Sequence, residues 1–295
     1  MVLHWLDDHR GETVVVKFGG NAMVDDSLAS TFAADIVALH NAGLRVVVTH
    51  GGGPQISREL ERRGIASEFR GGLRYTSEDA VLAVHDVLLA LGQDLATRVG
   101  NAGGDAVAVP GYTSALFTAT RRGTVVDGEK VDLGQVGEVS AVDPRVLSAL
   151  LDAGRIPVVS AIAHGNTDSS ARQLSDSGHL PRARQLLNIN ADSAAGSLAA
   201  ALRADWLILL TDVAGLYRDW PRLDSLVDSL TLDELDELLP QLVSGMIPKM
   251  EACRTAVAGG ACAAAVIDGR EPHALLSAPF GVGGTTVRNS EKATA

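Results

Sequence analysis

Short hydrophobic runs alternate with longer amphipathic segments along most of this chain. The runs end in glycine or polar residues, which is typical of strands buried in a parallel sheet. They predict six strands: Thr13–Phe18, Leu44–Thr49, Ala106–Val109, Ile156–Ser160, Trp206–Leu210 and Ala263–Ile267. Helical spacing of apolar residues predicts seven helices: Ser27–Ala42, Gln55–Arg63, Ser77–Ala102, Pro144–Ala153, Ala191–Arg203, Thr231–Leu239 and Pro248–Gly259. Such alternation forms βαβ units, so the sequence predicts an α/β fold with a mainly parallel sheet.

Two segments depart from this alternation. Thr124–Val142 is predicted to form hairpins, because two strand-like runs flank the turn Asp127-Gly128 and a third run follows Gly134. The segment His164–Leu186 is polar, rich in serine and without periodicity, so we expect a long, mobile surface insertion there. The helix at Ala191–Arg203 is predicted to mark the boundary between an N-terminal and a C-terminal half.

The composition indicates how large a core the chain can bury and which partners its net charge disfavours. The chain has 295 residues, of which 46% are hydrophobic and only 4% aromatic, so it can bury a large core of small aliphatic side chains. The formal net charge of −11 argues against nucleic acid or an anionic membrane as the main partner. An anion site in such a chain must be built locally, from lysines and backbone N–H groups.

The cysteines and the N-terminal segment indicate a cytoplasmic protein. Cys253 and Cys262 lie in Ala-rich contexts and are expected to be buried thiols rather than a disulfide or a metal site. The first residues carry charges where a signal peptide needs an apolar run. No stretch approaches the roughly 18 uncharged apolar residues that a membrane span needs.

Two glycine-rich loops each follow a predicted strand and open a helix. They are Lys17-Phe18-Gly19-Gly20-Asn21 and His50-Gly51-Gly52-Gly53-Pro54. Glycines let the backbone approach a ligand closely, and consecutive N–H groups at a helix N-terminus form an anion cradle. Such loops also serve as tight strand–helix corners, but two of them on neighbouring strands favour a phosphate site. Neither loop matches the P-loop pattern GxxxxGK[ST], and no GxGxxG follows the first strand.

Lysines are scarce in the chain, and two of them lie where an anion would bind. Lys17 is at the C-terminal end of the first strand, the edge at which open α/β sheets bind ligands. Lys249 follows Gly245-Met246-Ile247-Pro248 at a helix start, where the helix dipole already favours anions. A solvated lysine is the alternative interpretation for each of them.

Seven short segments, spread from about residue 13 to residue 287, form a further pattern. They are VVVKFGGNAM (14–23), VVVTHGGGPQI (46–56), GGLRYT (71–76), NINAD (188–192), LLTDVAGLY (209–217), SGMIPKMEAC (244–253) and IDGR (267–270). In this order and spacing they resemble the amino-acid kinase family, and within it the members that phosphorylate N-acetylglutamate.

This resemblance implies a three-layer αβα sandwich with a mainly parallel central sheet. Residues 1–202 would bind the acyl amino acid and mediate dimerisation, and residues 203–295 would bind ATP. The implied reaction transfers a phosphoryl group from ATP to the γ-carboxylate of N-acetyl-L-glutamate, giving N-acetylglutamyl 5-phosphate for arginine and ornithine biosynthesis. Mg²⁺ is expected to be held through the ATP phosphates.

The resemblance also assigns roles to residues that match the family motifs. Lys17 and Lys249 would stabilise the phosphoryl group in transfer, and Asp192 would hold both lysines in place. The implied substrate contacts are Gly52, Gly53, Arg74 (to the α-carboxylate) and Asn188 (to the acetamido group). The implied phosphate and nucleotide contacts are Gly19, Gly20, Thr211, Asp212 and Met246.

The chemistry of this reaction suits these residue types. A carboxylate is an adequate nucleophile near neutral pH, so no general base is required. Repulsion between two anions and the charge spread over the moving PO₃ oppose the reaction, so catalysis depends on positioning and electrostatic stabilisation. Two lysines and the backbone N–H groups can supply this stabilisation, and arginine suits a bidentate carboxylate contact.

Three segments of the substrate half differ from the usual family pattern. Tyr75-Thr76-Ser77 and the segment 110–114 indicate either an altered acyl group or neutral drift in loops. The insertion carries three arginines, Arg172, Arg182 and Arg184. An amino acid bound to a small acidic carrier protein is therefore the alternative substrate, although solvated arginines are the simpler interpretation. A non-catalytic ligand sensor is the alternative of a different class, and the presence of both lysines and Asp192 argues against it.

The segments linked to regulation and assembly also differ. Ala278 stands where arginine-inhibited members carry glutamate, so weak or absent arginine feedback is expected. The segment before the first strand is short, which favours a homodimer over a hexamer. The sequence leaves open whether a nitrogen-signalling protein binds.

Overall fold

An eight-stranded sheet runs through the whole molecule. The computed structural model describes residues 8–19, 23–71, 73–126, 128–165, 183–242, 245–277 and 283–289. The strand order is β14-β16-β15-β13-β1-β2-β10-β5, and within it only β15 and β16 are antiparallel. The strands are β1 (Thr13–Phe18), β2 (Arg45–His50), β5 (Ala106–Pro110), β10 (Ile156–Ser160), β13 (Trp206–Thr211), β14 (Ser229–Thr231), β15 (Ala263–Asp268) and β16 (Thr285–Arg288). All six predicted strands are confirmed.

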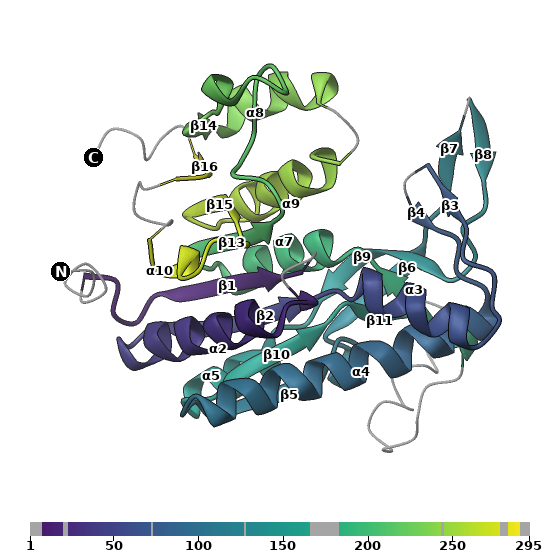
Figure 1. Ribbon diagram of the computed structural model, residues 1–295, viewed down its shortest axis with the longest axis horizontal. Helices are drawn as coiled ribbons and strands as arrows, with labels where there is room; N and C mark the ends of the chain where they lie inside the picture. The colour runs from purple at the N-terminus through teal and green to yellow at the C-terminus, as the bar shows by residue number, and fades with distance from the viewer. Residues whose placement is uncertain are drawn as a thin grey trace.

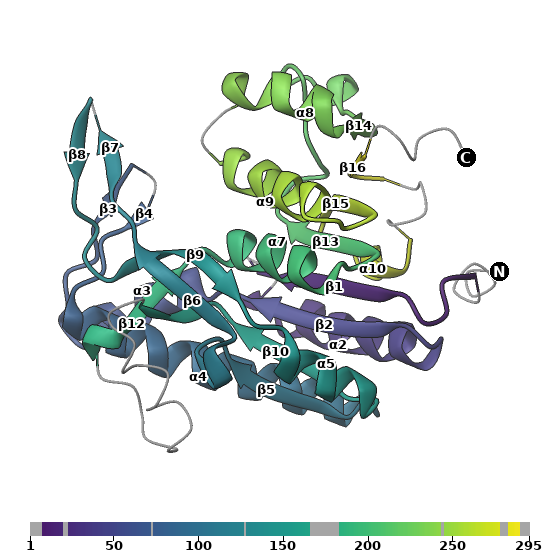
Figure 2. The ribbon, with the colours of Figure 1, turned by 180° about the vertical axis from the view of Figure 1, so that it is seen from behind.

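Helices cover both faces of this sheet, and all seven predicted helices are present (Figures 1 and 2). One face carries α2 (Asp26–Asn41), α4 (Glu78–Asn101) and the short α10 (Ala274–Ser277). The other carries α5 (Arg145–Asp152), α7 (Ala191–Leu202) and α9 (Ile247–Ala258). Helix α8 (Leu232–Leu238) packs on α9 and β14, and α3 (Gly53–Arg62) packs on α4. The three-layer αβα sandwich is therefore confirmed.

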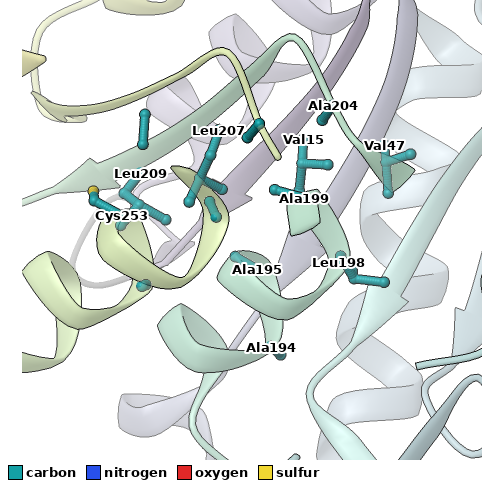
Figure 3. Packing of buried hydrophobic residues seen from close by; sticks show 14 of the residues in the cluster. Val15, Val47, Ala194, Ala195, Leu198, Ala199, Ala204, Leu207, Leu209 and Cys253 are labelled. Carbon is teal, nitrogen blue, oxygen red and sulfur yellow. The ribbon is translucent and has the colours of Figure 1, made fainter. Parts of the chain in front are cut away.

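Alternation along the central strands sends side chains into two separate cores. Val14 and Val16 of β1 pack with α2, whereas Val15 packs with α7 and α9, because successive strand residues point to opposite faces. Helices cover both faces of the sheet, so these strands are apolar throughout rather than alternating with polar residues. Figure 3 shows the second core, in which small side chains of α7, among them Ala195 and Ala199, lie close to Val15 and Leu207.

A smaller closed sheet adjoins the large one and carries much of the N-terminal half's loop structure. Its order is β11-β12-β9-β6, formed by Phe117–Arg121 (β6), Val136–Val142 (β9), Ile162–Gly165 (β11) and Leu186–Ile189 (β12). Two hairpins stand beside it at one end of the molecule (Figure 1): β3 (Phe69–Arg70) with β4 (Leu73–Arg74), and β7 (Thr124–Val126) with β8 (Glu129–Val131). The predicted hairpin of residues 124–131 is confirmed, and the third run pairs with β6 and β12 instead of β8.

The predicted insertion is shorter than expected. His164 and Gly165 belong to β11, Leu186 belongs to β12, and residues 183–185 form a 3₁₀ turn, because these ends complete the small closed sheet. Residues 166–182, with two of the three arginines, lie outside the described residues. Of the cysteines, Cys253 is fully buried as predicted, whereas Cys262 is only partly buried.

The predicted halves share one sheet. Strand β1 of the first half pairs in parallel with β13 of the second, and α7 packs along α9. The boundary near residue 203 therefore stays a prediction about function, because no break in the sheet marks it.

Helix α4 is long and apolar enough to cross a membrane by length and composition alone. Half of the most apolar 18-residue stretch of this helix is buried inside the molecule, as in the core helix of a soluble protein.

Close packing of α7 on α9 predicts a specific mutational effect. A Cβ added at Gly196 would lie 2.6 Å from the backbone oxygen of Ala252. We therefore expect Gly196→Ala to lower the free energy of unfolding by about 1–3 kcal/mol, through overpacking. The matched control is Gly100→Ala near the end of α4, where a Cβ would meet nothing within 4 Å. This change should stabilise the protein by about 0.5–1 kcal/mol, and urea unfolding of both variants tests the difference.

Candidate functional site

The predicted loops meet at the carboxyl edge of the large sheet. Parallel pairing places Lys17 of β1 beside Thr49 of β2 on one side and Leu209 of β13 on the other. The chain leaves these three strands at the same level, so the loops after Phe18, His50 and Thr211 lie together. This edge is where open α/β sheets bind ligands.

A buried carboxylate joins the two lysines at this edge. Asp192 lies in the first turn of α7, whose N-cap, Asn190, accepts hydrogen bonds from the Asp192 and Ser193 backbone N–H groups. Its Oδ1 is 2.9 Å from Lys17 Nζ, and its Oδ2 is 3.3 Å from Lys249 Nζ. The predicted grouping of these three side chains is present in the structure.

The charges of this group are mutually dependent. Asp192 is 6% exposed and Lys17 is 7% exposed. Burial alone would raise the pKa of Asp192, but the ammonium groups of Lys17 and Lys249 outweigh burial and hold its pKa below the ordinary value. The carboxylate is therefore ionised, and the group carries one net positive charge.

Glycine at position 19 leaves room for the Lys17 ammonium. A Cβ at Gly19 would lie 2.7 Å from Lys17 Nζ. A side chain there would push the ammonium away from Asp192, so the first glycine of the loop has a steric reason in addition to its backbone freedom. Gly20, the next predicted contact, lies outside the described residues.

Lys249 lines the larger of two cavities beside the charged group. It lies in the first turn of α9, and the cavity, of about 530 Å³, extends to Thr211 and Met246 as predicted. Asp212 is not among the lining residues. The wall also includes two aromatic rings that the sequence reasoning missed, Tyr217 and Trp220, which meet edge to face with centroids 5.2 Å apart.

A second cavity, of about 160 Å³, lies on the side of the small closed sheet. Its lining includes the predicted Arg74 and Asn188, and also Asn190 and Arg122, which the sequence reasoning missed. Asn190 could have been found from its N-cap position in NINAD. No local signal identifies Arg122, because pairing of β6 with β9 brings it to the cavity.

Arg74 is held by neutral groups. Its guanidinium donates to Ser67 Oγ, to Ser57 Oγ (2.7 Å) and to the Gly53 carbonyl (3.3 Å), and it lies 4.6 Å from the Phe69 ring centroid. In the described part of the chain its partners include no carboxylate, and burial lowers the pKa of Arg74. A buried cation with neutral partners is suited to bind an anion.

The predicted glycine contacts connect these parts. Gly52 is the N-cap of α3, and Gly53 opens that helix while its carbonyl accepts from Arg74. A Cβ at Gly51 would lie 3.2 Å from the Ala191 side chain, so the loop lies against the start of α7, next to Asp192. Asn188 donates to Thr76 Oγ1 at 3.4 Å. In the described ranges, no cluster of three or more His, Cys, Asp or Glu side chains could hold a metal ion.

Known proteins resemble this chain over nearly its whole length. The sequence profile of the amino acid kinase family matches residues 12–268. The chain belongs to the amino acid kinase family. It is 49% identical to an acetylglutamate kinase of Streptomyces avermitilis, over 99% of this chain and 93% of that protein. It is 52% identical to one of Acidothermus cellulolyticus, over 93% of this chain and 89% of that protein.

Solved structures confirm the fold of this kinase. An N-acetylglutamate synthase of Neisseria gonorrhoeae, in complex with coenzyme A and N-acetylglutamate, superposes with a TM-score of 0.78 at 23% identity. The match covers 98% of this chain and 62% of the synthase chain. The carbamate kinase of Giardia superposes with a TM-score of 0.65 at 19% identity, over 95% of this chain and 99% of that one.

The ionised Asp192 predicts a pH-dependent stability. Because its pKa is lowered on folding, its stabilising effect is present above the unfolded pKa of about 3.9 and is lost as the pH falls through the folded value. We expect Asp192→Asn to cost about 3 kcal/mol of unfolding free energy at pH 7. The difference from wild type should shrink below about pH 4.

Urea unfolding at several pH values measures this difference. The control is Asp152→Asn, because Asp152 forms an ion pair with Arg45 while 68% exposed, and its loss should cost below about 1 kcal/mol. A difference between wild type and Asp192→Asn that stays constant from pH 7 to pH 3 would contradict the assignment.

Proposed function

We propose that this kinase phosphorylates the γ-carboxylate of N-acetyl-L-glutamate with ATP, producing N-acetylglutamyl 5-phosphate and ADP in arginine biosynthesis. Relatives about 50% identical over nearly the whole chain are acetylglutamate kinases. The observation that carries the proposal is the Lys17–Asp192–Lys249 group, together with two cavities of different character: Lys249 lines the larger one, and Asn190, the N-cap of the helix that carries Asp192, lines the smaller one.

The acceptor fits the smaller cavity. A guanidinium and an amide, Arg74 and Asn188, match an α-carboxylate and an acetamido group, and arginine can hold a carboxylate through two parallel hydrogen bonds. Held at this end, the substrate's γ-carboxylate would face the glycine loop of Gly52 and Gly53. Neutral partners around Arg74 leave its positive charge available to the substrate.

The nucleotide fits the larger cavity. Tyr217 and Trp220 offer aromatic surface for a base, and the lining also includes Lys249, Thr211 and Met246. We assign the triphosphate to the neighbourhood of the Lys249 ammonium. Mg²⁺ bound through the ATP phosphates would neutralise part of their charge and bridge the phosphoryl oxygens.

Transfer itself would need positioning and charge stabilisation. An oxygen of the γ-carboxylate forms a bond to the γ-phosphorus while the bond from that phosphorus to the bridging oxygen of ADP breaks. Lys17 and Lys249 would stabilise the charge on the moving group, with Gly19, Gly20 and Gly52 N–H groups around it. Asp192 touches neither reactant and acts as a positioning residue that keeps both ammonium groups in place.

A second candidate acceptor is a related acylated amino acid, or one bound to a small acidic carrier protein. Two guanidinium groups, Arg74 and Arg122, line the smaller cavity, and within the described residues Arg122 forms an ion pair with Glu138 at 4.0 Å. This surplus of positive charge suits an acceptor with more than one anionic group. The arginines predicted to face such a carrier, at 172 and 182, lie outside the described residues, and the side chain of Arg184 is not described.

Removal of one lysine tests the site. We expect Lys249→Ala to lower kcat by roughly 10²–10³, by analogy with the loss of one transition-state donor. The matched control is Lys130→Ala on β8, an exposed lysine that should leave kcat unchanged. The assay incubates the enzyme with ATP, Mg²⁺, N-acetylglutamate and hydroxylamine, and it measures the acyl hydroxamate formed from the product.

Other results of this assay would contradict the mechanism or favour one of the alternative functions. Unchanged turnover by Lys249→Ala would show that the mechanism is wrong. Product with a carrier-bound amino acid, but none with N-acetylglutamate, would favour the second candidate. No product with either acceptor would favour a non-catalytic sensor.

The proposals on arginine feedback and on oligomeric state rest on the sequence. We propose weak or absent feedback by arginine, because Ala278 cannot pair with a cationic effector; this residue lies outside the described ranges. Hydroxamate formation should therefore change less than twofold when millimolar arginine is added, and strong inhibition would contradict the proposal.

We further propose a cytoplasmic homodimer, for which sedimentation should give about twice the chain mass of 30.7 kDa.

A further inference from the structure

A buried histidine lies directly beneath the second glycine loop. His50 is the last residue of β2 and is fully buried. Its Nδ1 is 2.9 Å from the carbonyl oxygen of Gly51, and its Nε2 is 3.2 Å from Ser160 Oγ at the end of β10. None of the roles assigned above uses this ring, although both of its nitrogens have partners.

The partners determine which nitrogen carries the proton. A carbonyl oxygen can only accept, so Nδ1 must be the N–H that donates to Gly51. Burial lowers the pKa of His50 to about 4, and the ring is therefore neutral at physiological pH. Nε2 is then an acceptor, and the Ser160 hydroxyl can donate a hydrogen bond to it. The ring has one defined tautomer.

Three elements fix the ring in place. Ser160 is paired in register with His50, and its hydroxyl also lies 3.3 Å from the Leu88 carbonyl of α4. Gly92, one turn further along α4, leaves room for the ring, since a Cβ there would lie 3.1 Å from Nε2 and 3.3 Å from Ser160 Oγ. Figure 1 shows β2 and β10 side by side above α4. The imidazole therefore cannot rotate without disturbing two strands and a helix.

Peptide geometry transmits this constraint to the loop. The Gly51 carbonyl and the Gly52 N–H belong to one planar, trans peptide unit and point in opposite directions. A hydrogen bond that holds the carbonyl down towards His50 therefore holds the N–H up, away from the core. At its other side, the Gly52 carbonyl accepts the first hydrogen bond of α3 from the Ile56 N–H at 2.8 Å. Without His50, the Gly51–Gly52 peptide could flip, because glycine tolerates both orientations.

We propose that His50 is a positioning residue, whose Nδ1–H orients the Gly51–Gly52 peptide so that the Gly52 N–H points at the transferring phosphoryl group. This inference rests on the proposed function, which places the phosphoryl group beside Gly52. His50 touches neither reactant. Its effect should be on kcat, because a rotated N–H removes a donor needed in the transition state, while the binding groups around Arg74 remain in place.

Asparagine and glutamine substitutions of His50 distinguish this positioning role from a purely structural role of the buried ring. The amide nitrogen of asparagine reaches the position of Nδ1, whereas that of glutamine reaches the position of Nε2. His50→Asn can therefore still donate to the Gly51 carbonyl, and we expect its kcat to stay within about fivefold of wild type. His50→Gln loses this donor, and we expect kcat to fall by about 10–10², with the acceptor KM changed by less than about threefold.

His85 supplies the matched control. It is also a buried histidine with both nitrogens bonded, to Asp86 and Tyr112, and neither of these partners belongs to a glycine loop. His85→Asn and His85→Gln should leave kcat within about twofold of wild type. Thermal unfolding of all four variants shows which are folded at the assay temperature. If a His50 variant is unfolded, Ser160→Ala replaces it; loss of the hydroxyl that donates to Nε2 should lower kcat by about threefold or more.

Equal losses of kcat in His50→Asn and His50→Gln, or wild-type kcat in His50→Gln, would overturn the inference. A second readout does not depend on the substrate. ¹⁵N spectra of the imidazole in the free protein should show His50 neutral and protonated at Nδ1 at pH 7, and an Nε2-protonated ring would also overturn it. If wild type phosphorylates a different acceptor, the proposed function fails, but the same variants can be compared with that acceptor.

Discussion

The ion pairs of Asp192 with Lys17 and Lys249 are the interaction on which the site depends. Two ammonium groups held near one point repel each other, and burial in a low-dielectric region strengthens this repulsion. A shared carboxylate removes it, with 2.9 Å to one lysine and 3.3 Å to the other. The lysines come from β1 and α9 and the aspartate from α7, so this contact joins three segments that are far apart in the sequence. It leaves one positive charge locally in a protein whose formal net charge is −11.

The sequence predicted the central sheet well for a physical reason. Its strands are covered by helices on both faces, so they are continuous apolar runs that contrast with the amphipathic helices. The two strands at one side of the sheet, β14 and β16, were missed, since runs of three or four residues carry little pattern. The small closed sheet was only partly foreseen, because β11 and β12 pair across residues that are distant along the chain. Their ends were consequently assigned to the insertion.

The site residues that lie in compact motifs were predicted from the sequence, and those that depend on tertiary contacts were not. Residues within compact motifs, such as Lys17 and Asp192, were identified because local sequence determines their place at a strand end or a helix start. The partners of Arg74 could not be foreseen, because they depend on how the hairpin β3–β4 folds over α3. Arg122 and Trp220 reach their cavities through tertiary pairing of segments without motifs. The role inferred for His50 also depends on the folded structure, since it follows from the direction of one carbonyl group.

The small side chains of α7 and α9 connect the bulk composition to the charged site. Glycine and alanine along the contact let the helices approach closely: a Cβ at Gly196 would lie 2.6 Å from the backbone of Ala252, and one at Gly259 would lie 2.3 Å from the Ala200 side chain. Because the helices pack this tightly, their first turns converge and Asp192 can reach Lys249. Both N-termini then point towards the same region, where their dipoles favour an anion. A helix N-terminus disfavours a lysine, and Asp192 offsets this cost for Lys249 while the ammonium remains available. The scarcity of aromatic residues is therefore part of how the site is built, because larger side chains between α7 and α9 would separate the two charges.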